Sequence, residues 1–295
     1  MATILLDGRE FRITGRVLRT MALRDDLLDD IQDPETVANL SRKGHVPADI
    51  LTFSQHLPDL SPKFSYCMEW DNLAAVPIST YEYWLMKQIH PNTRNKINKA
   101  RRAGIVVEIE ELTRRLAEGI VGIFNETPVR RGRLYSYYGR DVETVEKEWS
   151  KDSKRSDFLV AYYQNEIIGF IQLVYGKGYA RTSGTVAKIS HRNKAPMNAL
   201  ISKAVETCAE KKIPFLVYGK YIYGQKSQDS LTIFKQNNGF KKFDVPRYYI
   251  PLSLRGKLGL RLGLHHGIFE LFPNRAQRLL SKIRFLWYER LTLKK

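Results

Sequence analysis

The sequence predicts an α+β fold, in which a mixed, mostly antiparallel sheet is flanked by helices. Three runs rich in β-branched and aromatic residues follow one another between 157 and 189, and the short turns between them contain Asn or Gly. This pattern is typical of an antiparallel meander. Helical and strand-like patterns then alternate up to residue 252, which adds helices packed on the sheet. The 295 residues are 43% hydrophobic and 27% charged, enough for one large globular domain or two smaller ones.

Residues 1–79 are expected to form an N-terminal accessory region. Leucines and clustered acids over 17–31 favour one amphipathic helix, and 63–69 favours a strand. Four prolines between 47 and 77 divide the rest of this region into short pieces.

Residues 80–252 are expected to form the main domain. Pro91 and Gly104 bracket a helix, as residues at a helix start and just past a helix end often do. Helices are predicted over 80–89, 92–103, 112–125, 196–212 and 230–238, and strands over 105–109, 157–163, 167–175, 179–189, 215–218 and 241–251.

A large excess of positive charge points to an anionic partner. Lysine and arginine number 48 against 31 acids, a formal net charge of +17. Such an excess suits nucleic acid, anionic lipid or phosphorylated small molecules. The helix over 92–103 carries five basic residues and no acid between 94 and 102, and like charges at i,i+4 cost about 0.2–0.5 kcal/mol per pair. This face is either simply solvated or covered by an anion such as tRNA, a nucleotide-linked sugar or lipid phosphate.

The last segment, 253–295, is expected to be a basic, amphipathic, helical tail. It carries ten basic residues and two acids, interleaved with leucines and the aromatic cluster at 285–288. Each basic residue near an anionic leaflet contributes about 1 kcal/mol, so peripheral membrane contact is one interpretation. Packing of the apolar residues on the body of the domain is the other, and the sequence favours neither.

Several classes of protein are excluded by residue usage. Cys67 and Cys208 are far apart, which argues against a disulfide framework or a Cys-rich metal site. The histidines show no metal-ligand spacing, and His265-His266 has no third ligand nearby in sequence, so no metal is expected. Cys208 falls on the apolar face of its helix and is expected in the core rather than as a nucleophile. Charges near the N-terminus and the lack of a long apolar run favour a cytoplasmic protein, at most peripheral at the inner membrane face.

Two local signatures resemble the GNAT superfamily of acyltransferases, and within it the FemAB-like branch associated with bacterial cell-envelope and polysaccharide genes. The first is the basic stretch from Arg94 to Ile105, similar to an R-x-x-I-x-K-A-x-K-x-G-I/V pattern. The second runs from Ala195 through Phe234-Lys235 and Gly239-Phe240 to Leu252, with an F-K-x-x-x-G-F ending. The resemblance covers roughly residues 80–252 and implies a GNAT-like sheet, with residues 1–79 as a degenerate GNAT-like part.

The resemblance implies a donor site at the start of the helix over 196–212. GNAT enzymes that use acetyl-CoA usually have a glycine-rich loop there, whose N–H groups and helix dipole hold the pyrophosphate. This chain has no glycine between His191 and Ala199. We expect acetyl-CoA or another acyl-CoA as co-substrate, with aminoacyl-tRNA, the donor of FemAB-like relatives, as the alternative. The expected donor-binding residues are Ile189, Ser190, Arg192, Lys194, Asn198, Ala199 and Lys220, with the backbone near Ser190 polarising the donor carbonyl.

The loop over 125–139 is expected to border the acceptor. Arginine grips phosphate and tyrosine stacks on sugar rings, so this mixture suits a phosphorylated or sugar-like acceptor. Glu126 is the candidate general base. The expected substrate-binding residues are Asn125, Arg130, Arg131, Arg133 and Tyr138. A solvated loop with its tyrosines packed on the sheet explains the pattern equally well.

Two tyrosines after the strand at 215–218 are candidates for a general acid. Tyr221 or Tyr223 would reprotonate the leaving thiolate or ribose hydroxyl, although burial of each ring in the core is the more common outcome.

The sequence thus favours a GNAT-fold transferase that moves an acyl group, most simply acetyl, to an amine or hydroxyl of a cell-envelope or polysaccharide precursor, such as a nucleotide-linked or lipid-linked sugar. A tRNA-dependent aminoacyl transferase and a non-catalytic GNAT-like binding module are the alternatives.

Overall fold

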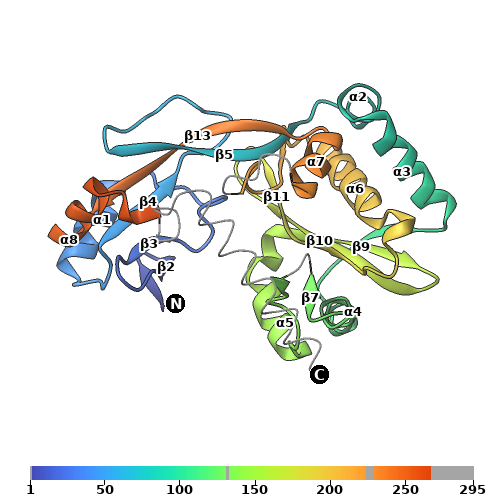
Figure 1. Cartoon of the computed structure of the whole chain (residues 1–295), viewed down its shortest axis with the longest axis horizontal. Helices are drawn as coiled ribbons and strands as arrows, with labels where there is room; N and C mark the ends of the chain where they lie inside the picture. Colours follow the sequence, from blue (N-terminus) through green and yellow to red (C-terminus); the bar gives the residue numbers. More distant parts are fainter. Residues whose placement is uncertain (1, 131–132, 224–228, 267–295) are drawn as a thin grey trace. The chain divides into compact units, whose positions relative to one another are not determined.

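The computed structural model describes residues 2–130, 133–223 and 229–266. It divides into two compact units (Figure 1). Unit 1 combines Met1–Asp71 with Asp244–Lys295, and unit 2 is Asn72–Phe243. The chain therefore passes between units within β5 (Cys67–Pro77) and within β13 (Lys241–Pro251), not at the expected boundaries 79/80 and 252/253.

Unit 1 is built on a small mixed sheet. The strands β1 (Ala2–Leu6), β2 (Arg9–Thr14) and β3 (Thr20–Leu23) form an antiparallel meander. Helix α1 (Pro34–Lys43) leads to β4 (Ile50–Ser54), which pairs parallel with β3 and antiparallel with β13. The helix expected over 17–31 is wrong, because Met21 and Leu23 alternate into the core as strand residues.

The described part of the C-terminal segment continues unit 1. Helix α8 (Leu254–Arg261) begins at Ser253, whose hydroxyl accepts the Gly256 N–H at 3.0 Å and donates to Asp49 at 3.0 Å. A one-turn 3-10 helix, η4 (Leu264–His266), follows. The remainder of the expected tail, from residue 267, lies outside the described residues.

Unit 2 contains the longer strands and most of the helices. Its sheet has the order β5, β12 (Phe215–Val217), β11 (Ala180–Ala187), β10 (Glu166–Tyr175), β9 (Ser156–Tyr163), β6 (Val106–Glu110). Its neighbours are antiparallel except for β11 and β12, which are parallel. The expected mixed, mostly antiparallel α+β sheet is confirmed.

The helices of unit 2 also follow the sequence closely. The segment expected to be helical over 80–89 is α2 (Tyr81–Tyr83) and the π-helical turn η1 (Trp84–Gln88). The other expected helices are α3 (Pro91–Arg102), α4 (Arg114–Phe124), α6 (Pro196–Glu210) and α7 (Ser230–Asn237). Unforeseen elements are α5 (Val142–Trp149), the 3-10 turns η2 (Ser150–Arg155) and η3 (Arg192–Lys194), and the short hairpin β7 (Val129–Arg130) and β8 (Arg133–Leu134).

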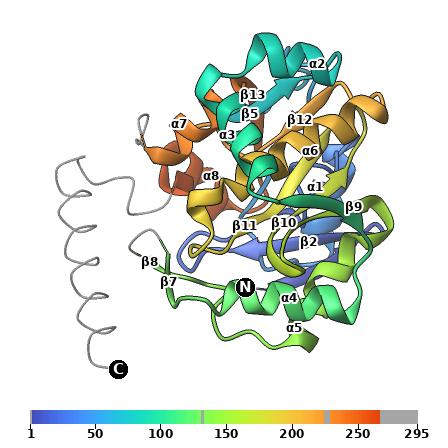
Figure 2. The ribbon, with the colours of Figure 1, turned by 90° about the vertical axis from the view of Figure 1, so that its right-hand side faces the viewer.

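Both faces of the sheet in unit 2 are covered by helices (Figure 2). On β9, Leu159 and Ala161 join a core with α3 and α6, whereas Phe158 and Val160 join a second core with α4 and α5. Burial on both faces explains why β9 and β10 read as continuous apolar runs. Cys208 on α6 is fully buried in the first of these cores, as expected.

The same order of elements occurs in both units. An antiparallel three-stranded meander, a crossover helix and a fourth strand parallel to the third describe β1–β2–β3–α1–β4 and also β9–β10–β11–α6–β12. In each case the fourth strand then pairs antiparallel with one of the two strands, β13 or β5, that pass between units. The N-terminal region therefore repeats the central topology of unit 2.

Candidate functional site

The strands β11 and β12 part soon after they begin to pair. Their parallel register covers Ala180 with Leu216 and Arg181 with Val217. After Val217 the chain stays bonded to β5, since Tyr218 donates to the Ala74 carbonyl at 2.8 Å and Ala74 donates to the Gly219 carbonyl at 2.8 Å. β11 instead continues to Ala187 along β10. The backbone of β11 beyond Arg181 therefore borders the place where the sheet opens.

A bulge in β11 marks this opening. Between the pairs Phe170–Val186 and Gln172–Ser183, β11 has one more residue than β10. Gly184 lies there with φ of +59°, and a Cβ atom at this position would come within 2.1 Å of the Trp149 ring. Bulges of this kind redirect the backbone and its side chains.

The connection from β11 to α6 is fastened by Glu126, which follows the end of α4. Its carboxylate accepts the backbone N–H of Ile189 at 2.6 Å and that of Ser190 at 2.9 Å. The Ser190 hydroxyl donates to the same carboxylate at 2.7 Å, and Arg130 pairs with it at 3.1 Å. The N–H groups expected to polarise a donor carbonyl are thus occupied by a side chain of the chain itself.

These contacts set the protonation of Glu126. Partial burial acts to raise its pKa, but the hydrogen bonds from Ser190 and Ile189 together with the charge of Arg130 lower the pKa below its usual value. A carboxylate stabilised in its ionised form is a weak base, so the geometry favours an anchoring role for Glu126 over proton abstraction.

Arg130 ties the 125–139 loop to the sheet. Its guanidinium donates to the backbone carbonyls of Ala187 at 2.9 Å and Ile123 at 2.8 Å, and it lies 4.7 Å from the Tyr135 ring centroid. Asn125 accepts the Gly139 N–H at 2.7 Å, which closes the loop on itself.

The tyrosines of this loop divide into buried and exposed ones. Tyr135 and Tyr137 pack on Phe124, and burial raises the pKa of Tyr135 to about 12. Tyr138 and Arg133 are exposed and available to an acceptor. Arg131 lies outside the described residues.

Helix α6 begins without a side-chain cap. Ala195 precedes it with φ of +58°, a left-handed conformation that usually requires glycine, and Pro196 occupies the first turn, as expected. Ala199 continues the helix, its N–H bonded to the Ala195 carbonyl at 3.4 Å. The first turn carries no acid, so the positive end of the helix dipole is not offset by a carboxylate of that turn.

The polar residues at this end of α6 have different surroundings. Asn198 is buried and donates to Asn238 at 3.3 Å, which fits a structural role. Lys194 lies 4.7 Å from the Tyr163 ring centroid, and Arg192 is exposed in η3. Of the donor-binding residues expected in the β11–α6 connection, Arg192 and Lys194 thus place positive charge near the surface.

The segment after β12 places its tyrosines beside a buried lysine. Tyr221 is half-buried against the core, and Tyr223 is exposed by 48%. Burial of part of the ring raises the pKa of Tyr223, which keeps its hydroxyl protonated near neutral pH. Lys220 is exposed, and its backbone carbonyl accepts a hydrogen bond from the Lys235 ammonium.

Lys235 is the functional candidate that the sequence did not single out as a site residue. Its side chain comes from α7 and is fully buried, with Nζ 4.7 Å from the Tyr223 ring centroid and 5.2 Å from that of Tyr218. A buried ammonium is costly unless polar groups and ring faces surround it. The signal that could have found it was its place inside the F-K-x-x-x-G-F pattern, directly after Phe234.

A cationic surface lies next to the start of α6. Helix α3 packs along α6 and also contacts η3, which carries Arg192 and Lys194 (Figure 2). Arg94 is used internally, donating to the backbone carbonyls of Leu85 and Met86 at 3.0 Å each. The exposed basic residues of α3 are Lys96, Lys99, Arg101 and Arg102.

Within the part of the chain that the structure describes, no helix is long and apolar enough to cross a membrane.

Comparison with known proteins identifies the fold. No protein-family model matches the sequence, and no curated protein matches it either. Among solved structures, the C-terminal domain (DUF2156) of a putative lysylphosphatidylglycerol synthetase from Agrobacterium fabrum superposes with a TM-score of 0.59 at 13% identity, covering 89% of this chain and 86% of that one. FemX gives a TM-score of 0.58 at 9% identity, covering 88% and 89%.

A third structure, L-PGS from Bacillus licheniformis, gives a TM-score of 0.56 at 13% identity, with 88% of this chain and 85% of that one covered. At these identities the matches show the fold. The predicted resemblance to the GNAT fold, in the form found in FemX and the DUF2156 domain, is confirmed. The residues at the opening of the sheet have no such test and stay predictions.

Proposed function

From the GNAT fold that this chain shares with FemX and the lysylphosphatidylglycerol synthetase domain, we propose that it is a transferase whose donor is an aminoacyl-tRNA and whose acceptor is an amine or hydroxyl of a cell-envelope precursor. The fold alone leaves the donor open between an acyl-CoA and an aminoacyl-tRNA. The choice rests on the surface of unit 2 around the start of α6.

The observation that carries the proposal is the cationic surface made by α3 and η3. It combines the exposed basic residues of α3 with Arg192 and Lys194 beside the uncapped end of α6. A nucleic acid backbone gains affinity from each phosphate that such residues neutralise. The basic residues along α3 are more than the few phosphates of coenzyme A could contact at once, whereas a tRNA backbone could contact them all.

Aminoacyl transfer fits the side chains at the opening of the sheet. The acceptor nitrogen or oxygen would form a bond to the donor carbonyl carbon and give up its proton to water. The bond from that carbon to the ribose oxygen would break, and the ribose oxygen would take up a proton. Tyr223, whose hydroxyl is protonated at neutral pH, is the proposed source of that proton and would regain one from water. Lys235, beneath Tyr223, would add a positive charge close to the developing oxyanion.

Glu126 has a different role in this proposal. Its carboxylate holds Ile189 and Ser190, which keeps the β11–α6 connection in one conformation for the donor. The acceptor would lie against the exposed side of the 125–139 loop, with Tyr138 and Arg133 as contacts. One of the similar structures is named as a domain of a putative lysylphosphatidylglycerol synthetase, and lysylphosphatidylglycerol carries an amino acid on a lipid headgroup, which supports an envelope acceptor. Such a reaction would take place in the cytoplasm or at the inner membrane face.

Acyl-CoA is the second candidate donor, because the start of α6 favours an anion. A 15-residue helix without an acid in its first turn can bind the pyrophosphate of a CoA carrier, with Arg192 and Lys194 beside it. Against it stand the missing glycines and the proline in the first turn, which has no N–H to donate.

Binding and transfer measurements on the full chain separate these donors. We expect bulk aminoacyl-tRNA to bind with an affinity that falls steeply with salt, and to pass labelled amino acid to an envelope extract. Acetyl-CoA and CoA should produce no saturable thermal shift. Salt-tolerant stabilisation by acetyl-CoA, with transfer of its acetyl group, would instead establish the second candidate, and binding of tRNA without transfer would indicate a binding module.

A matched pair of charge reversals tests the surface itself. Replacing Lys96 and Lys99 by glutamate should weaken tRNA binding by at least about tenfold and reduce the slope of log affinity against log salt by about 2. The control replaces Lys151 and Lys154, exposed lysines of η2, and changes the net charge by the same amount. Equal losses in both double variants would mean that general charge, rather than the α3 surface, attracts the nucleic acid.

A further inference from the structure

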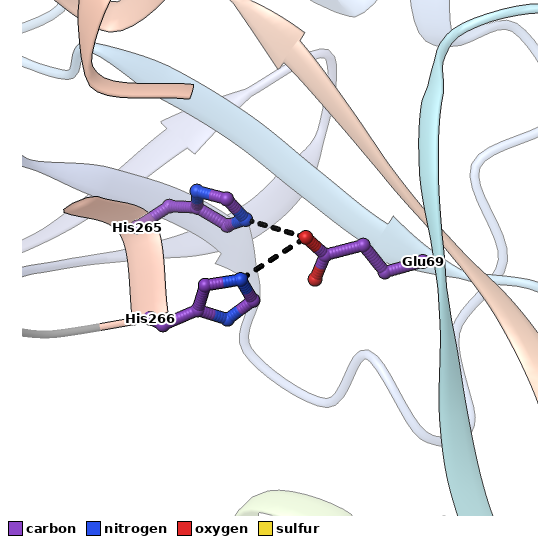
Figure 3. Close-up of side chains that lie close together, drawn as sticks. All are labelled: Glu69, His265 and His266. Atoms are coloured by element: carbon purple, nitrogen blue, oxygen red, sulfur yellow. Dashed lines mark hydrogen bonds and ion pairs between the residues drawn. The ribbon is translucent and has the colours of Figure 1, made fainter. Parts of the chain in front are cut away.

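Three side chains with metal-ligating atoms meet in unit 1, and none of them belongs to the candidate site of unit 2. Glu69 lies on β5, and His265 and His266 form the end of the η4 turn (Figure 3). The Nε2 atom of His265 is 2.9 Å from Oε1 of Glu69, and the Nε2 atom of His266 is 3.1 Å from the same oxygen. The sequence predicted no metal because Glu69 is 196 residues away from His265.

The spacing of these atoms suits a small divalent cation. One ligating atom from each residue lies within 4.8 Å of the others. Four-coordinate zinc binds imidazole nitrogen and carboxylate oxygen at about 2.0–2.2 Å, so two of its ligand atoms lie about 3.3 Å apart. The two nitrogen–oxygen distances in the cluster are close to that separation, and an ion needs only small side-chain adjustments to enter.

Tyr249 on β13 holds two of the three ligands in place. Its ring lies edge-on to His265, with centroids 4.7 Å apart, and its hydroxyl forms a hydrogen bond with the Glu69 carboxylate. Such outer contacts orient metal ligands in many proteins. The side chain of His265 is only 3% exposed, whereas those of His266 and Glu69 are 41% and 36% exposed. The cluster is therefore anchored on one side and open to entering ions on the other.

A hydrogen-bonded arrangement alone explains the cluster poorly. Both imidazoles direct Nε2 at one carboxylate oxygen, and their ring centroids are 4.0 Å apart, so three ligating side chains converge on one point. Nδ1 of His265 is buried and has no hydrogen-bond partner among the described residues. The ring is thus positioned through its Nε2 side, where Glu69 and His266 meet it.

We propose that Glu69, His265 and His266 bind a divalent transition-metal ion, zinc by preference, with solvent in the fourth position. Two imidazoles and one carboxylate suit zinc and its first-row neighbours, whereas magnesium and calcium take oxygen ligands. The ion would link η4 to strand β5. This inference is independent of the transfer reaction.

Metal binding to the untagged full-length chain tests the proposal. After removal of metal with a chelator, titration with zinc followed by calorimetry should give one ion per chain, magnesium should give no heat of binding, and cobalt should give the visible absorption of a tetrahedral site. Zinc should also raise the melting temperature, because it binds only the folded cluster.

Variants assign the site. Glu69→Gln keeps the size of the side chain, His266→Ala alters an exposed one, and each should weaken zinc binding by more than about tenfold and abolish the cobalt spectrum. The control is His45→Asn, at an exposed histidine with φ of +49° that asparagine tolerates. Circular dichroism of the metal-free variants checks that they are folded. Absence of stoichiometric zinc binding, or unchanged binding in folded Glu69→Gln and His266→Ala, would overturn the proposal.

Discussion

The carboxylate of Glu126 accepts two hydrogen bonds from Ser190, which lies 64 residues further along the chain, one from the backbone N–H at 2.9 Å and one from the side-chain hydroxyl at 2.7 Å. This contact joins the segment after α4 to the connection between β11 and α6. It converts a loop that carries donor-binding candidates into one with a fixed backbone. The same contact favours an anchoring role for Glu126 over the role of general base, which the sequence alone could not distinguish.

Replacing Glu126 by glutamine or by alanine tests those roles. An anchoring carboxylate is partly replaced by an amide, whose oxygen still accepts a hydrogen bond, but not by alanine. We expect Glu126→Gln to keep transfer activity within about tenfold and Glu126→Ala to lose more, because general-base catalysis would be worth about 10²–10⁴-fold. Steady-state transfer rates with each donor provide the measurement. A loss of transfer rate of 10²-fold or more in a normally stable Glu126→Gln variant would show that Glu126 acts as a general base.

The stability of the protein should depend on Glu126 in a defined pH range. Because the folded-state pKa of Glu126 is lowered from its ordinary value of 4.5, its contribution is fully present above that pH and is lost as the pH falls through the folded-state pKa. Urea denaturation should therefore give wild type an advantage over Glu126→Gln at pH 6 that shrinks below pH 4.5. An advantage that grows on acidification would contradict the hydrogen-bonding pattern.

The extent to which sequence predicted the fold differs between the units for a physical reason. In unit 2, β9 and β10 are buried on both faces, and their apolar runs end at turns, so the local pattern and the final environment agree. In unit 1, the leucines and acids of 17–31 match a helical period, yet Thr20–Leu23 is a strand. Its partners on β2 and β4 supply the backbone hydrogen bonds, and such tertiary pairing overrides local propensity.

The sequence indicated which segments form the candidate site, but not which of their side chains contact one another. Glu126 and Ser190 were both named from sequence, one for the acceptor and one for the donor, and the structure joins them. The absence of glycine between His191 and Ala199 concealed the left-handed residue at Ala195, because residue type indicates such a conformation only when glycine or asparagine is present. The contact between Glu69 and His265 could not be predicted from the sequence, because β5 and η4 come together only in the folded chain.

Lys235 should affect activity more than stability. Methionine fills a similar volume and removes the cost of burying an ammonium, which offsets the hydrogen bond that the Lys220 carbonyl loses. We expect Lys235→Met to fold with unchanged or higher stability and to lose about 10²–10³-fold in transfer rate, the range found when one oxyanion-stabilising group is removed. The exposed Lys241→Met serves as control. Loss of folding in Lys235→Met would assign Lys235 a structural role, and full activity of the folded variant would exclude a role in transfer.

Gly184 is predicted to be intolerant of any side chain. An alanine there needs a positive φ and also places Cβ 2.1 Å from Trp149 and 2.8 Å from Phe170. Left-handed strain costs about 1–2 kcal/mol, and overpacking adds about 1–3 kcal/mol. Gly178→Ala shares the positive φ but has open space around it, so it should lose only the first contribution. Equal urea midpoints for the two variants would show that the bulge relaxes around the new methyl group.

Ala195 offers the opposite test, in which glycine should be the better residue. At φ of +58°, Ala195 carries left-handed strain that glycine avoids, and this gain offsets the extra backbone entropy that glycine loses on folding. We expect Ala195→Gly to raise the free energy of unfolding by between zero and about 1 kcal/mol. Ala199→Gly, inside α6, should lower it by about 1 kcal/mol. The same variant should bind the donor more weakly, even though it is no less stable. Glycine frees the backbone before α6, and that backbone must be ordered again when the donor binds. Thermal unfolding and donor titration of the same two variants separate these effects, and a destabilised Ala195→Gly would show that the left-handed conformation carries no strain there.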